Sequence, residues 1–78
     1  MSSNRVVIGV TGATGAILSL RLVQYLKSTG REIFVIYTPS AEYVAHLEIG
    51  GIDRITELAD YSYSSQEPVS PTISGSFD

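Results

Sequence analysis

Apolar positions in the first half of the chain follow two different periods. Residues 6–10 form a nearly continuous β-branched run, which predicts a strand buried on both faces. Residues 16–29 carry apolar side chains at helical spacing, which predicts a helix ended by Gly30. The apolar face of that helix is expected to be formed by Ile17, Leu18, Leu20, Leu22, Val23 and Leu26. Residues 32–37 are apolar in succession and predict a second strand.

Weaker signals follow the second strand. Ser40 is a plausible N-cap for a helix over 40–48, with an apolar face of Tyr43, Val44 and Leu47. A short helix is expected over 52–59. Residues 61–78 are rich in serine and poor in aliphatic side chains, so this segment is interpreted mostly as loop, without a third strand. The order of elements predicts an α/β fold that begins with a β-α-β unit.

Length, cysteine content and charge limit the class of protein to which the chain can belong. The chain has 78 residues, which is short for a nucleotide-binding α/β domain, and no cysteine for a disulfide or a thiolate metal site. Its net charge is −3 and its basic residues are scattered, so nucleic-acid binding has little support. No apolar run approaches a membrane span, and the N-terminus does not fit a signal peptide. A cytoplasmic protein is the expectation.

The strongest candidate site is the loop from Gly12 to Gly15, between the first strand and the first helix. Small residues allow backbone N–H groups to approach phosphate oxygens, and Thr11 and Thr14 add hydroxyl donors. The alternative is a tight turn without a ligand. A phosphate-bearing cofactor is the favoured interpretation.

The surrounding residues favour a mononucleotide over a dinucleotide. Leu18 stands where dinucleotide-binding folds usually have a third glycine, and no carboxylate follows Tyr37 to hold a ribose hydroxyl. FMN fits better, because it has one phosphate and no second ribose. Thr38 and Ser40 follow the second strand, where ligands of open α/β sheets bind, although helix capping by Ser40 explains them equally well.

Other polar residues carry less chemistry. His46 is the only histidine and lacks a companion ligand, so it is interpreted as a surface or interface residue rather than a metal or catalytic group. Asp53, Glu57 and Asp60 are interpreted as a solvated face. The Ser74-Gly75-Ser76 segment is a second small, hydroxyl-rich loop that gains meaning only beside the first.

Three segments taken in order resemble the N-terminal part of the UbiX-type flavin prenyltransferases, within a wider FMN-binding flavoprotein superfamily. They are Ile8-Gly-Val-Thr-Gly-Ala-Thr-Gly-Ala-Ile17 with Arg21-Leu22, then Tyr37-Thr-Pro-Ser-Ala41, then Ile73-Ser-Gly-Ser-Phe77. Threonine replaces the family's usual serine at positions 14 and 38, and Pro39 replaces a common lysine.

The resemblance implies a fold, a cofactor and a reaction. The fold would be the N-terminal part of a flavodoxin-like or Rossmann-like three-layer sandwich, with residues 1–78 as part of a single FMN-binding domain. Gly12, Ala13, Thr14 and Thr38 would bind FMN, and Ser74, Gly75 and Ser76 would lie near the prenyl phosphate. The reaction would join a dimethylallyl group from dimethylallyl phosphate to reduced FMN, and a partner decarboxylase would use the product.

The resemblance also limits what these residues do alone. The family's catalytic residues would lie beyond position 78, so the chain would hold only part of the site, and homo-oligomerisation is expected. Three alternatives stay open. They are a related FMN-dependent cysteine decarboxylase, an NAD(P)-binding protein of the dehydrogenase kind, and a fragment without catalytic activity.

Overall fold

A computed structural model describes residues 4–66 and the backbone of residues 72–74. The elements are β1 (Arg5–Val10), α1 (Ala16–Ser28), β2 (Glu32–Tyr37), α2 (Pro39–Ile49), α3 (Asp53–Thr56), β3 (Tyr61–Ser64) and β4 (Thr72–Ser74). The strands form one sheet in the order β3-β2-β1-β4, in which β1, β2 and β3 are parallel and β4 is antiparallel to β1. The predicted α/β class and the initial β-α-β unit are confirmed.

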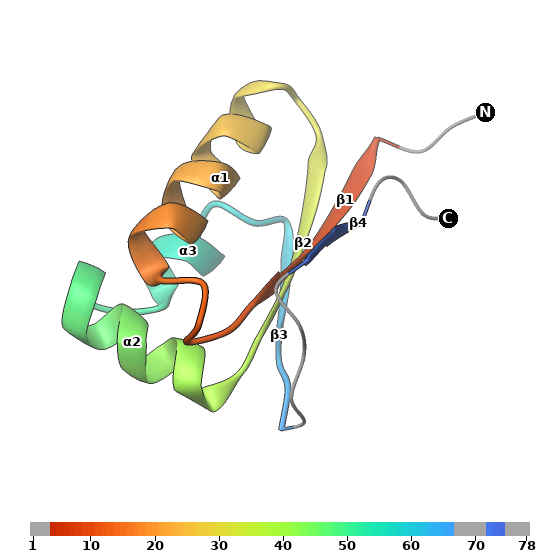
Figure 1. Cartoon of the computed structure of the whole chain (residues 1–78). Helices are drawn as coiled ribbons and strands as arrows, with labels where there is room; N and C mark the ends of the chain where they lie inside the picture. Colours follow the sequence, from red (N-terminus) through yellow and green to blue (C-terminus); the bar gives the residue numbers. More distant parts are fainter. Residues whose placement is uncertain (1–3, 67–71, 75–78) are drawn as a thin grey trace.

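In the described part of the chain, α1, α2 and α3 all lie on one face of the sheet (Figure 1). The core fills the space between that face and the helices, because alternate strand residues point to the same side. It is formed by the buried side chains Val6, Ile8, Val10, Val23, Leu26, Ile33, Val35, Ala41 and Ile55. No helix in the described part of the chain is long and apolar enough to cross a membrane.

The predicted first helix is confirmed, but its buried face is narrower than expected. Ala16, Ser19, Val23 and Leu26 are its buried residues, whereas Leu18 is 62% exposed and Ile17 is also exposed. Ser19 is the polar residue of this buried face, and its hydroxyl donates a hydrogen bond to the carbonyl oxygen of Gly15 at 3.0 Å.

The second helix differs from the expectation in its start and its buried face. Thr38, not Ser40, is the N-cap, because the Thr38 hydroxyl accepts a hydrogen bond from the Ala41 amide. Pro39 then occupies the first turn, where a missing N–H costs nothing. The buried residues are Ala41 and Ala45, while Tyr43 and Leu47 point outward and are exposed. The short helix predicted over 52–59 is present as α3, which spans only Asp53–Thr56.

The prediction that no third strand follows residue 60 is wrong. β3 and β4 both lie in the segment interpreted as loop. β3 alternates tyrosine and serine, and it is held by parallel pairing with β2 and by ring contacts with Phe34. The serine-rich composition suggested a loop, whereas pairing with β2 and ring contacts with Phe34 stabilise β3 as a strand.

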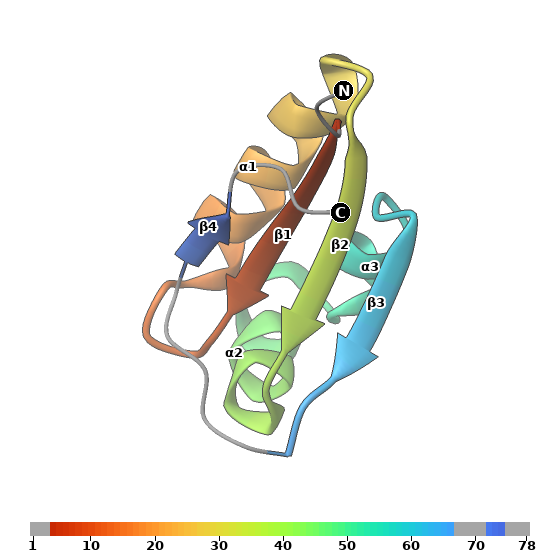
Figure 2. The ribbon, with the colours of Figure 1, turned by 90° about the vertical axis from the view of Figure 1, so that its right-hand side faces the viewer.

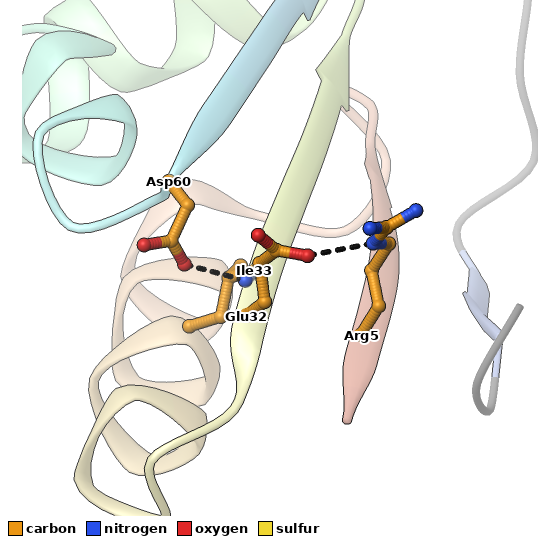
Figure 3. A network of polar contacts seen from close by, with 4 residues as sticks. All are labelled: Arg5, Glu32, Ile33 and Asp60. Atoms are coloured by element: carbon orange, nitrogen blue, oxygen red, sulfur yellow. Dashed lines mark hydrogen bonds and ion pairs between the residues drawn. The ribbon is translucent and has the colours of Figure 1, made fainter. Parts of the chain in front are cut away.

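Polar contacts tie the amino ends of the three parallel strands together (Figure 3). Arg5 at the start of β1 forms an ion pair with Glu32 at the start of β2, with Nε and Oε1 2.6 Å apart. Asp60, just before β3, accepts a hydrogen bond from the Ile33 amide at 2.7 Å and lies 3.6 Å from the Lys27 ammonium. These contacts join the strands at their amino ends, which is the end of the sheet opposite the loop of residues 11–15.

Candidate functional site

The loop of residues 11–15 and the start of α2 meet at the carboxyl ends of β1 and β2. The two strands are parallel and in register, with Val10 opposite Tyr37, so the residues that follow them emerge side by side. The Gly12 amide donates a hydrogen bond to the Ser40 hydroxyl over 3.3 Å. A Cβ built on Gly12 would lie only 3.3 Å from Ser40 atoms, so this approach favours glycine. The loop that begins at Gly12 and the start of α2 are therefore in direct contact.

The capping role suggested for Ser40 belongs to Thr38, and a contact of Thr38 with FMN stays a prediction. Thr38 is buried, and its hydroxyl caps α2 while lying 3.0 Å from the Ser40 hydroxyl. Ser40 is exposed and faces the loop. Of the two hydroxyls, Ser40 therefore offers the more accessible contact for a ligand, and Thr38 positions it.

The loop turns sharply at Gly15. This residue has φ +87°, a conformation that side chains strongly disfavour, and it directly precedes α1. The Thr14 amide donates to the Thr11 carbonyl oxygen at 3.3 Å, and the two threonine hydroxyls lie 3.5 Å apart. In this turn Ala13 is exposed, and the other residues of the loop are half-buried.

The first backbone amide of α1 already has a carboxylate as its hydrogen-bond acceptor. Glu48, on α2, accepts a hydrogen bond from the Ala16 amide over 2.8 Å. Gly15 has no side chain to cap the helix, so Glu48 serves as a remote N-cap and its charge complements the helix dipole. The sequence carries no local signal for this contact, because 32 residues separate the two groups.

Some backbone amides of the loop donate no hydrogen bond to another described residue. Within residues 4–66, the amides of Ala13 and Gly15 make no hydrogen bond to another protein group. Ala13 is exposed and Gly15 is half-buried. Amide and hydroxyl donors such as these suit an anionic or carbonyl-rich ligand. The Glu48 carboxylate disfavours a second anion at the Ala16 amide itself, so a phosphate would bind nearer to Ala13.

The third predicted segment lies elsewhere in the described backbone. Ser74 pairs with Val7 in the middle of β1, while Thr72 pairs with Gly9. The chain therefore runs away from the carboxyl ends as it passes from residue 72 to residue 74. Gly75 and Ser76 lie outside the described residues, so a role for this segment stays a prediction.

The remaining candidates do not form a site among the described residues. His46 is exposed on α2, and no group of three metal-binding side chains is found in this part of the chain. Asp60 is engaged with the Ile33 amide and with Lys27, so its position is explained by the sheet.

Relatives with curated names match the chain over nearly all of its length. A probable UbiX-like flavin prenyltransferase of Bacillus subtilis is 40% identical over 75 residues, which cover 95% of this chain and 37% of the relative. A flavin prenyltransferase UbiX of Saccharolobus solfataricus is 43% identical over 76 residues, covering 92% and 37%. The UbiX of Escherichia coli K12 is 31% identical over 75 residues, covering 94% and 40%.

The chain spans about two fifths of the length of the curated relatives it matches. No protein-family model matches it, and no solved structure matches it significantly. The chain is therefore related, over almost all of its residues, to part of the UbiX-type flavin prenyltransferases. The relationship and the β-α-β fold agree with the resemblance found in the sequence.

Proposed function

We propose that this chain forms part of the flavin site of a UbiX-type flavin prenyltransferase, with FMN as the flavin and dimethylallyl phosphate as the prenyl donor. The observation that carries the proposal is the contact between the Gly12 amide and Ser40, which joins the two segments predicted to bind FMN. Supporting it are relatives that are named flavin prenyltransferases at 40% and 43% identity.

The residues at the site would bind and orient the flavin. The Ala13 and Gly15 amides and the Ser40 hydroxyl would donate hydrogen bonds to FMN, with Thr14 adding a hydroxyl and buried Thr38 holding Ser40 in place. Gly12 would keep the loop close to α2. When bound, reduced FMN supplies the nucleophilic ring that accepts the dimethylallyl group. Donors around a departing phosphate stabilise its developing charge.

The full activity would require more than these residues. Residues that complete the catalytic site would come from the rest of a UbiX-type domain, since the chain spans about two fifths of its relatives. Homo-oligomer formation, supply of prenylated FMN to a decarboxylase and a cytoplasmic location are parts of the same proposal.

Calorimetric titration of the purified chain with FMN, riboflavin and NADPH tests the cofactor. We expect FMN to bind more tightly than riboflavin, because only FMN carries the phosphate, and NADPH to bind weakly. Ser40→Ala should weaken FMN binding at least about tenfold, because a hydrogen bond to a charged group contributes roughly 1.5–3 kcal/mol. Ser62→Ala, an exposed serine on β3, is the matched control.

Three results would contradict the proposal. Tight NADPH binding without FMN binding would favour a dinucleotide-binding protein. Equal losses of affinity in the Ser40→Ala and Ser62→Ala variants would remove Ser40 from the site. Conversion of a cysteinyl substrate by the FMN-loaded protein would favour the related decarboxylases.

A further inference from the structure

Among the described strands, the two longest lie between the two shortest (Figure 2). β1 and β2 have six residues each, whereas β3 has four and β4 has three. In the order β3-β2-β1-β4, the short strands β3 and β4 therefore form the two edges of the described sheet. Very short edge strands are one means by which natural proteins limit the pairing of their sheets with those of other molecules.

β1 has the composition of a strand that pairs readily when its edge is exposed. Its sequence, Arg5-Val-Val-Ile-Gly-Val10, contains four β-branched residues, one charged residue and no proline. Such strands have high β-propensity and little to oppose the addition of another strand. β2 pairs with β1 along its whole length, so the edge of β1 that faces away from β2 is the one that a second molecule could reach.

β4 covers the middle of that edge. It pairs antiparallel with residues 7–9 and places Ile73 opposite Ile8. Two residues of β1 precede this pairing and one follows it, which is too short a stretch on either side to hold another strand. The antiparallel direction also indicates what β4 excludes. Two identical edges related by a two-fold axis pair antiparallel, so β4 occupies the place and the direction that β1 of a second copy would take.

We propose that residues 72–74 act as an edge strap, which keeps β1 from pairing antiparallel with β1 of a second copy of this chain. The edge strap competes with the second copy for the same backbone N–H and C=O groups, so its effect rests on backbone pairing. Release of the edge strap would join two sheets edge to edge through their apolar strands. The proposal is independent of the proposed function, because it involves no flavin.

Proline substitution in β4 tests the edge strap. Residues of an antiparallel pair alternate between hydrogen-bonded and non-hydrogen-bonded positions, so either residue 73 or its two neighbours direct their N–H groups toward β1. The double variant Thr72→Pro/Ile73→Pro therefore removes an N–H group that the pairing uses in either case. Thr72→Val/Ile73→Val is the matched control, because it changes the same positions and keeps both N–H groups and a high β-propensity.

Cross-linking through a single thiol reports pairing between copies at β1. The chain has no cysteine, so Val7→Cys supplies the only thiol for a short bis-maleimide reagent. In flavin-free protein, the cross-linked dimer should reach half of its maximum at a concentration at least about tenfold lower in the proline variant than in the wild type, which corresponds to about 1.4 kcal/mol. Tyr25→Cys, at an exposed position on α1, controls for general association, and its cross-linking should be unchanged.

Circular dichroism establishes that the variants keep the wild-type helix content. If the double proline variant loses it, the single variants Thr72→Pro and Ile73→Pro replace it, and only one of them should increase cross-linking, because only one of these N–H groups faces β1. Unchanged cross-linking at position 7 in the proline variants would overturn the proposal. Equal increases at positions 7 and 25 would show general aggregation instead, and an equal increase in the valine control would reject backbone pairing as the cause.

Discussion

The bond between Glu48 and the first amide of α1 leads to a prediction about stability. Glu48→Ala removes both the acceptor of the Ala16 amide and the negative charge at the helix N-terminus. Glu48→Gln keeps an oxygen that accepts the hydrogen bond and removes only the charge. The pair of variants separates the two contributions.

The expected magnitude follows from the geometry. The bond is 2.8 Å long, and Gly15 provides no side-chain cap in its place. Loss of a capping acceptor costs about 0.5–2 kcal/mol, and loss of a charge near a helix end costs about 0.3–1 kcal/mol at low salt. We expect Glu48→Ala to lower the free energy of unfolding by about 1–2 kcal/mol, and Glu48→Gln by less than half of that.

The free energy of unfolding is measured by urea denaturation at low and at high salt, with circular dichroism as the signal. The Glu48→Gln deficit should shrink in high salt, because the charge–dipole interaction is screened, whereas most of the Glu48→Ala deficit should remain. Glu57→Ala, on an exposed glutamate after α3, controls for loss of a carboxylate. A Glu48→Ala protein as stable as Glu57→Ala would refute the remote cap.

Substitutions at three further positions test other local features by thermal unfolding. Asp60→Ala should cost about 1–3 kcal/mol, because the Ile33 amide loses its acceptor, and Asp60→Asn should recover part of the loss; an unchanged melting temperature in Asp60→Ala would contradict this. Thr38→Val should lower the free energy of unfolding by about 1 kcal/mol, because the Ala41 amide loses its acceptor, whereas Thr38→Ser should keep the cap. Equal melting temperatures of the Thr38→Val and Thr38→Ser proteins would argue against capping. Gly50→Ala should cost roughly 1–2 kcal/mol, because Gly50 ends α2 with φ +90°, and a neutral result would show that the turn relaxes.

Local pattern was sufficient for the elements whose stability is local. The apolar runs of β1 and β2 and the periodicity of α1 identify those elements, and parallel pairing then places the Gly12 loop beside Thr38. The adjacency of the two segments was predictable because the carboxyl ends of neighbouring parallel strands always meet.

Features that depend on distant partners were not predictable. β3 is a strand because β2 and the Phe34 ring hold it, and its serines suggested loop. Glu48 is a cap only because α2 brings it across to α1. The absence of glycine at position 18 is also a weaker argument than the sequence suggested. Leu18 is exposed, and the buried residues in the first turn of α1 are Ala16 and Ser19.

The polar contacts of Arg5, Glu32 and Asp60 all lie at the amino ends of the parallel strands, whereas the candidate site lies at the carboxyl ends. Register and chemistry therefore draw on different residues. Selection on ligand preference can change the loops at the carboxyl ends, while the contacts at the amino ends continue to align the strands. We therefore expect random libraries directed at residues 11, 13, 14 and 40, with Gly12 kept, to retain folded protein more often than libraries directed at the amino-end residues.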